Sequence, residues 1–230
     1  PGSSQTCPKP HGAVDGRGAP LLYLHGFASG PESSKGQFFQ ARFAETGRKL
    51  ELPYLTEGDF ERTTLTQQLA LLDRLAGPGP AMLIGSSMGG YLAALFAARN
   101  AGRVPVAGLL APAFGLAHRW AESLDEATLR EWRERGWRTV YHYGEKRQRH
   151  IGYALISDGL EYEEFPDVRQ PALVIHGRRD ESVDYRLSER FAQDRPNAEL
   201  VLYDSDHQLL DVLEPMWQRI RTFLDCPSAC

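Results

Sequence analysis

The sequence predicts an α/β fold in which helices flank a mostly parallel central sheet, and three observations lead to this prediction. Short apolar runs alternate along the chain with segments of helical periodicity. The runs contain few polar residues, which is typical of strands buried on both faces of a parallel sheet. Glycine-containing polar loops follow several runs, at the sheet edge where such folds bind ligands.

Each expected element has its own signal. Apolar runs predict strands, and apolar residues spaced by three and four predict amphipathic helices, as in 61–76, which Gly-Pro-Gly-Pro ends. Ser33 or Ser34 is positioned to cap the first helix, and small residues in 91–100 favour close packing on the sheet. The strands are expected at 21–24, 49–52, 81–84, 104–110, 172–175 and 199–203, and the helices at about 35–47, 61–76, 91–100, 185–194 and 209–224.

The length of 230 residues suits one domain. We expect residues 1–19 to be a flexible N-terminal lead-in and residues 20–230 to form a single domain. The alternation fails over about 114–168, which we interpret as a helical lid or cap inserted after a strand. Its aromatic residues, including Trp120, Trp132 and Trp137, are expected to pack this segment onto the sheet, and some to line an acyl pocket.

Composition limits the classes of partner. A net charge of −4 gives no footprint for nucleic acid, and no apolar run approaches the roughly 18 residues of a membrane span. The cysteines, Cys7, Cys226 and Cys230, lie near the ends and form no disulfide framework, and Pro1–Pro20 lacks the apolar region of a signal peptide. We therefore predict a cytoplasmic location and expect no cofactor and no metal; the oligomeric state is not determined by these features.

A basic cluster at residues 146–150, KRQRH, lies within the insertion. We interpret it as a solvated face. The alternative is a site for a phosphate-bearing carrier such as coenzyme A, since Arg and Lys bind phosphate well.

The segment 81–91, AMLIGSSMGGY, contains the pattern G-x-S-x-G between an apolar strand and a helix. This pattern is typical of a nucleophile elbow, in which the serine occupies a strained turn and crowding requires glycine two residues before and after it. Ser87 is thereby the candidate nucleophile, whereas its neighbour Ser86 is expected to be buried. The Met88 N–H, at the start of the next helix, is a candidate oxyanion donor.

A serine hydroxyl needs a base, and the base needs a third group to orient it. Asp180 follows the strand at 172–175 by one loop and is the candidate acid, with Glu181 and Asp184 as alternatives. His207 follows the last strand and is the candidate base. The order Ser, Asp, His is the one found with this elbow.

Other histidines are assigned different roles. His25 is interpreted as organising the loop after the first strand, where the Phe27 N–H is the candidate second oxyanion donor, and His176 as structural. Asp206 is interpreted as a turn residue beside the base. His11, His118, His142 and His150 lie in the lead-in or the insertion and are not expected to be the base.

The chain resembles the α/β-hydrolase superfamily over Leu21–Leu224, and within it is similar to small bacterial esterases of the YqiA type. The resemblance is carried by residues 21–27 (LLYLHGF) with Ser29, Pro31, Ser33 and Lys35, by 85–91 (GSSMGGY), by 111–113 (APA), and by 180–186 (DESVDYR) with Asp206 and His207. It implies hydrolysis of carboxylic esters or acyl thioesters, with Ser87, Asp180 and His207 at the triad positions. Two features depart from the pattern: the tryptophan-rich insertion, and Asp206 in place of the usual glycine before the histidine.

The sequence thus predicts a serine hydrolase, a carboxylesterase or thioesterase, that acts on a small-molecule ester or thioester through an acyl-enzyme. Two alternatives use the same triad, a carbon–carbon bond hydrolase and a cofactor-free perhydrolase. A third alternative is a ligand-binding protein without catalysis.

Overall fold

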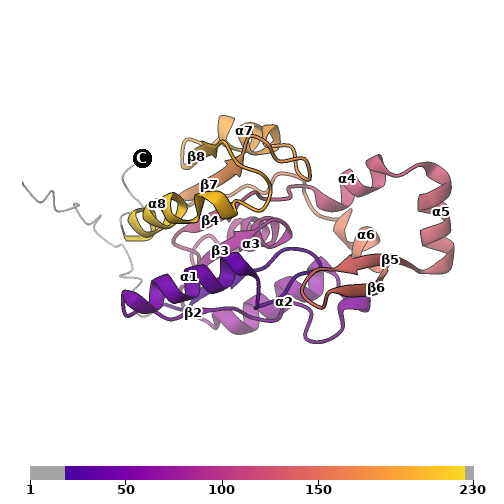
Figure 1. The fold of residues 1–230 in the computed structure, drawn as a ribbon, viewed down its shortest axis with the longest axis horizontal. Helices are drawn as coiled ribbons and strands as arrows, with labels where there is room; N and C mark the ends of the chain where they lie inside the picture. Colours follow the sequence, from indigo (N-terminus) through magenta and orange to yellow (C-terminus); the bar gives the residue numbers. More distant parts are fainter. Residues whose placement is uncertain (1–18, 226–230) are drawn as a thin grey trace, which may run out of the picture.

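A computed structural model describes residues 19–225. The lead-in expected at residues 1–19 lies outside the described residues except for residue 19. The centre of the structure is a parallel six-stranded sheet with strand order β2-β1-β3-β4-β7-β8 (Figure 1). The predicted α/β fold with a mostly parallel sheet is confirmed, and each expected strand is present within a few residues of its predicted ends. The strands are β1 (Leu21–Leu24), β2 (Leu50–Glu51), β3 (Met82–Ser86), β4 (Ala107–Leu110), β7 (Ala172–Gly177) and β8 (Ala198–Tyr203).

Helices cover both faces of the sheet and bury a separate apolar cluster on each. On one face, α1 (Ser34–Glu45) contributes Phe39 and Phe43 to a cluster shared with α8 (Leu213–Asp225). On the other face lie α2 (Leu65–Ala76), α3 (Met88–Arg99) and α7 (Arg186–Gln193). Within β3, Leu83 joins one cluster and Ile84 the other, because successive side chains of a strand point to opposite faces.

The helix predicted at 61–76 begins later than expected, at Leu65. Phe60–Arg62 forms a short 3₁₀ turn, η2, and Thr64 then caps α2. The Thr64 side chain accepts from the Gln67 N–H while the Gln67 side chain accepts from the Thr64 N–H, so both donors are satisfied at that point. This reciprocal capping box, which the apolar spacing does not reveal, sets the start of the helix.

The insertion contains three helices and an antiparallel hairpin. The helices are α4 (Leu116–Ser123), α5 (Glu126–Arg135) and α6 (Ala154–Gly159), and the hairpin pairs β5 (Trp137–His142) with β6 (Arg147–Gly152) (Figure 1). The sequence analysis expected a helical insertion and did not predict this hairpin. Its side chains pack partly through ring stacking, as between Trp137 and His150 at 3.7 Å between centroids, so no apolar alternation marks the strands.

Trp120 and Trp132 pack the insertion onto the apolar cluster of the domain, as the sequence analysis expected, whereas Trp137 stacks on His150 within the hairpin. Trp132 is 2% exposed and donates its indole N–H to the Ile151 carbonyl. Trp120 packs edge-on against Phe27 with ring centroids 4.9 Å apart. At the hairpin turn, the Gly144 N–H donates to the Ala28 carbonyl at 3.2 Å. The insertion therefore contacts the loop that follows β1.

Between residues 19 and 225, none of the helices combines the length and the apolar character needed to cross a bilayer. The cytoplasmic location stays a prediction.

Candidate active site

Ser87 lies at the turn between β3 and α3 with φ 55° and ψ −119°, a backbone conformation that L residues rarely adopt. The glycines two residues away make this turn possible. A Cβ on Gly85 would lie 2.1 Å from the Gly89 carbonyl oxygen, and a Cβ on Gly89 would lie 2.1 Å from the Leu24 oxygen. The spacing of the motif is therefore a steric requirement of the elbow.

Backbone hydrogen bonds hold the elbow against β4. The Ser87 N–H donates to the Leu110 carbonyl at 2.8 Å, and the Ala113 N–H donates to the Ser87 carbonyl at 3.0 Å. Ser86 is buried, as the elbow geometry led us to expect. The serine whose side chain reaches the candidate base is thus Ser87.

The structure brings the three predicted residues together in one hydrogen-bonded row. His207, in the loop after β8, has its Nε2 3.1 Å from Ser87 Oγ and its Nδ1 2.6 Å from Asp180 Oδ2. Since the carboxylate can only accept, Nδ1 carries the proton and Nε2 is left to accept from the Ser87 hydroxyl. This is the protonation state in which a histidine can act as a general base.

The Asp180 side chain is completely buried and its carboxylate is well satisfied. Oδ1 accepts from the N–H groups of Ser182 and Val183, both at 2.8 Å, and Oδ2 contacts His207 and His176. Burial alone would raise the pKa of this carboxyl, but the hydrogen bonds outweigh burial and hold the pKa well below its ordinary value. Asp180 is therefore ionised at neutral pH.

The other acidic candidates occupy different positions. Asp184 Oδ1 accepts from the Arg186 N–H at the start of α7, and Glu181 is exposed at the surface of the same loop. Asp206 Oδ1 accepts from the N–H groups of Gln208 and Leu209, at 2.9 and 3.2 Å, so it stabilises the turn beside His207. Among the described residues, Asp180 is the carboxylate in contact with His207.

His176 has a more specific place than the structural role assigned from the sequence. Its Nε2 lies 2.9 Å from Asp180 Oδ2 and 3.1 Å from the Val183 carbonyl, while Nδ1 lies 2.7 Å from Ser188 Oγ. Both neighbours of Nε2 are acceptors, so Nε2–H donates to the acid and Nδ1 accepts from Ser188. The spacing of four residues between His176 and Asp180 was visible in the sequence, but it did not show that the two side chains turn toward each other.

Lys35 is a second residue near the site that received no role from the sequence. This lysine of α1 is only 7% exposed, and its Nζ donates to the His207 carbonyl at 3.4 Å. Burial lowers the pKa of Lys35 to about 8, although the charges of Asp180 and Asp206 favour the protonated form. A buried cation thus lies under the loop that carries the candidate base.

The loop after β1 runs alongside the elbow. A Cβ on Gly26 would lie 3.3 Å from Ser87 Cβ and 3.8 Å from Ser87 Oγ, which places the neighbouring Phe27 beside the candidate nucleophile. His25 is buried, with Nδ1 3.0 Å from the Gly26 carbonyl and Nε2 accepting from the Leu55 N–H at 3.3 Å. The sequence analysis interpreted His25 as organising this loop, and the structure shows that it does so by joining the loop to residue 55. Burial lowers the pKa of His25.

The two candidate oxyanion donors are free to face a ligand. Within the part of the chain that the structure describes, neither the Phe27 N–H nor the Met88 N–H donates to a protein acceptor. Met88 is the first residue of α3, where helical N–H groups lack an intrahelical partner and the helix dipole is positive. Both amides come from segments adjoining Ser87.

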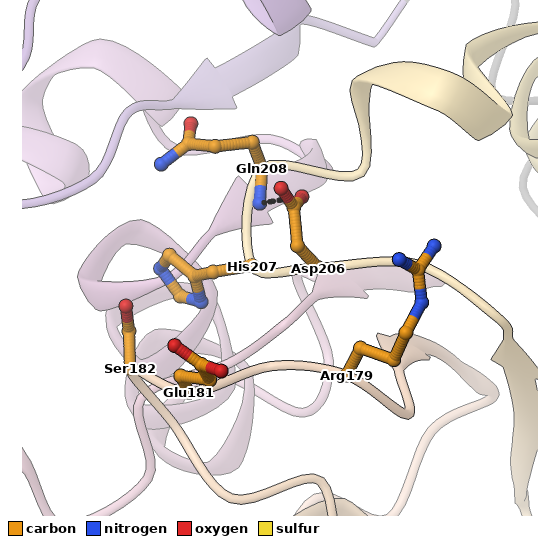
Figure 2. Close-up of a pocket in the computed structure, with 6 residues that line it drawn as sticks. All are labelled: Arg179, Glu181, Ser182, Asp206, His207 and Gln208. Atoms are coloured by element: carbon orange, nitrogen blue, oxygen red, sulfur yellow. Dashed lines mark hydrogen bonds between the residues drawn. The ribbon is translucent and has the colours of Figure 1, made fainter.

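A polar cleft of about 410 Å³ opens beside His207 (Figure 2). The loop after β7 and the loop after β8 form its walls, with the His207 ring between them. Its lining residues are Arg179, Glu181, Ser182, Asp206, His207 and Gln208.

The basic cluster of the insertion is largely neutralised by nearby acids. Arg147 Nε lies 2.6 Å from a Glu145 carboxylate oxygen, and Arg149 pairs with the same carboxylate and with Glu61. This pairing is consistent with a solvated face and leaves Lys146 as the lysine or arginine of the cluster that has no ion pair among the described residues. Between residues 19 and 225, no three His, Cys, Asp or Glu side chains are grouped so that they could hold a metal ion.

Comparisons with solved structures show which proteins share this fold. A putative hydrolase from Agrobacterium vitis S4 matches with a TM-score of 0.76 and 24% identity over 90% of this chain and 88% of its own. Alpha/beta hydrolase domain-containing protein 10 from mouse matches with a TM-score of 0.74 and 21% identity over 89% of each chain. Est1E from Butyrivibrio proteoclasticus, with ferulic acid bound, matches with a TM-score of 0.72 and 20% identity over 89% and 88%.

These likenesses confirm the α/β-hydrolase fold that the motifs implied. A comparison with curated proteins found no match. A protein-family model matches residues 20–225, which is nearly the whole described chain. The chain therefore belongs to the family described as Uncharacterised protein family (UPF0227).

Proposed function

We propose that the protein is a serine hydrolase that cleaves carboxylic esters or acyl thioesters through a covalent acyl-enzyme. The observation that carries this proposal is the row of hydrogen bonds from Ser87 Oγ through the His207 imidazole to the buried Asp180 carboxylate. A hydroxyl, an imidazole and a carboxylate in this order make an activated nucleophile.

The proposed cycle begins when Ser87 Oγ attacks the substrate carbonyl carbon and His207 Nε2 takes the hydroxyl proton. The ionised Asp180 stabilises the imidazolium that forms and keeps the ring oriented. His207 then gives the proton to the departing alcohol or thiol. A water molecule, deprotonated by His207, attacks the acyl-enzyme and releases the carboxylic acid.

The negative oxygen that forms at each addition step needs donors already in place. The N–H groups of Phe27 and Met88 suit this role because they adjoin Ser87 and have no acceptor among the described residues. The strained serine backbone also supports the proposal, since strain of this kind persists where it serves function. The ferulic acid bound to Est1E is a further support, because it places a carboxylic acid in a protein of the same fold.

The decisive experiment combines labelling with mutation at the elbow. A fluorophosphonate probe should label the wild-type protein at Ser87, and Ser87→Ala should abolish labelling. It should also lower kcat for a p-nitrophenyl ester by about 10⁴-fold or more. Ser86→Ala is the matched control and should retain labelling, because Ser86 faces the interior.

A folded wild-type protein that neither reacts with the probe nor cleaves esters would reject the proposal and favour a ligand-binding role. Labelling of Ser86 instead of Ser87 would reject the residue assignment alone. Circular dichroism of each variant separates a loss of chemistry from a loss of fold.

A further inference from the structure

The structure contains two cavities of opposite chemistry, one lined by the candidate base and one in the insertion. The cleft at His207 is lined by charged and amide or hydroxyl side chains. A second cavity of about 260 Å³, in the insertion, is mostly apolar and is lined by Trp120, Ser123, Leu124, Arg138 and Val140. An ester also has two parts, an acyl group and a leaving group, which can differ in polarity.

The geometry of acyl transfer connects each part to one side of the site. The histidine must protonate the leaving atom, so the leaving group of a bound ester would lie on the His207 side, and His207 is a lining residue of the polar cleft. The acyl carbonyl oxygen faces the proposed oxyanion donors on the other side. There the Phe27 ring contacts Trp120, a wall of the apolar cavity.

The charges around the cleft are mainly negative. Glu181 and Asp206 line it, and the buried Asp180 lies behind His207. The cation of Arg179 lies close to two further carboxylates, Asp204 at 2.8 Å and Asp211 at 3.5 Å.

Lys35 lies beneath the histidine loop, where its charge interacts with Asp180 and Asp206. Among the lining residues of the cleft, two carboxylates, Glu181 and Asp206, therefore accompany one cation, Arg179. Glu181 forms no ion pair with any described residue, so its charge is available to a ligand.

We propose that this cleft binds the leaving group and selects alcohols or thiols that are polar and either uncharged or cationic. It should disfavour anionic leaving groups, in particular phosphate-bearing thiols such as coenzyme A. This inference rests on the proposed hydrolase function and adds the substrate class. The physical reason is the direct Coulomb interaction between the leaving group and the carboxylates, which changes sign with the charge of the ligand.

Matched substrate pairs isolate the charge of the leaving group. Choline butyrate and 3,3-dimethylbutyl butyrate have the same shape and differ in a quaternary nitrogen against a carbon. Butyryl-coenzyme A and butyryl-N-acetylcysteamine present the same thioester and differ in the phosphate-bearing part. After normalising to the rates of hydroxide-catalysed hydrolysis, kcat/KM should favour choline butyrate and butyryl-N-acetylcysteamine, each by roughly five- to tenfold at low salt.

Glu181→Gln tests the source of the selectivity, because it removes one charge and keeps the shape of the side chain. Glu181→Gln should reduce both preferences severalfold. In the wild type, 0.5 M NaCl should also reduce both preferences, because salt screens the interaction between charges. Glu134→Gln is the matched control, since Glu134 is an exposed carboxylate of α5, in the insertion (Figure 1). This variant should keep the wild-type ratios.

Equal kcat/KM within each pair, or ratios that Glu181→Gln leaves unchanged, would overturn the inference while the hydrolase function stands. A preference for butyryl-coenzyme A would overturn it as well. Failure to cleave even the uncharged esters, together with no fluorophosphonate labelling, would instead reject the proposed function on which the inference rests.

Discussion

The loops that carry the candidate triad and the insertion at 114–168 are stabilised in different ways. The triad loops begin at the ends of β3, β7 and β8, and their backbones approach one another closely: a Cβ on Gly177 would lie 2.3 Å from the Ser205 carbonyl oxygen. Within the insertion, aromatic pairs and arginines over rings, such as Arg135 over Trp137 at 3.6 Å, join elements that the sequence pattern does not connect. Backbone packing leaves clear glycine and strand signals in a sequence, whereas contacts between distant side chains leave few.

Because the triad loops carry the proposed catalytic residues, we expect a change inside them to have the largest effect, on kcat. Asp180→Asn keeps the size of the side chain, but its amide group can donate a hydrogen bond to His207 Nδ1, whereas the carboxylate only accepts one. The proton of His207 would then move to Nε2, where it prevents the ring from accepting the Ser87 proton. We expect kcat for a p-nitrophenyl ester to fall by about 10⁴-fold, measured by steady-state kinetics. Asp184→Asn, in the same loop, is the control and should change kcat less than threefold or so; a similar loss in both variants would contradict the assignment of the acid.

In the insertion, the largest effect should be on stability. Trp132 is buried within the apolar cluster of its face of the sheet, and Trp132→Ala should lower the free energy of unfolding by roughly 3–5 kcal/mol. Trp137→Ala is the control, because Trp137 is partly exposed and stacks on His150 at the surface; its cost should be about 1 kcal/mol. Urea denaturation measures both, and equal costs would show that Trp132 does not anchor the insertion.

Lys35 allows the electrostatics of the triad loops to be tested through pH. The unfolded chain holds this proton up to about pH 10.5, whereas the folded protein releases it near pH 8. The unfolded state therefore binds more protons between these values, and the free energy of unfolding should rise with pH across that window. Lys35→Met should remove this rise and, at pH 7, stabilise the fold by roughly 1–3 kcal/mol.

Urea denaturation of wild type and Lys35→Met at pH 7 and pH 10 measures the difference. Lys49→Met is the control, because Lys49 is exposed and pairs with Glu51 at the surface. The same pH dependence in wild type and Lys35→Met would show that Lys35 does not titrate in this window.

The smallest effect should come from the basic cluster of the insertion. The Arg147 side chain is 63% exposed and pairs with Glu145, so Arg147→Ala should change the free energy of unfolding by less than about 1 kcal/mol. It should also leave kcat/KM for butyryl-coenzyme A unchanged, which steady-state assays can check. A clear loss with this substrate alone would revive the hypothesis that the cluster binds a phosphate-bearing carrier.

Much of the fold was predictable because buried strands are short, apolar and followed by glycine loops. The same signals placed the candidate nucleophile, acid and base at one edge of the sheet. The predicted start of α2 at residue 61 was wrong because a capping box at Thr64 sets the first residue of the helix. The hairpin at 137–152 was not predicted because its strands contain arginines and histidines. The contacts of His176 and Lys35 with the site were missed because they depend on how side chains turn within a folded loop.

The sequence by itself determined the succession of strands and helices along the chain, the glycine-dependent elbow and the residue types available for acyl transfer, because steric crowding and strand burial constrain neighbouring residues directly. Only the tertiary structure decided that a buried lysine lies under the histidine loop, that His176 donates to the acid, and that carboxylates outnumber cations around the cleft. These features arise from residues far apart in the chain, and their charges and burial are set by distances that exist only after folding.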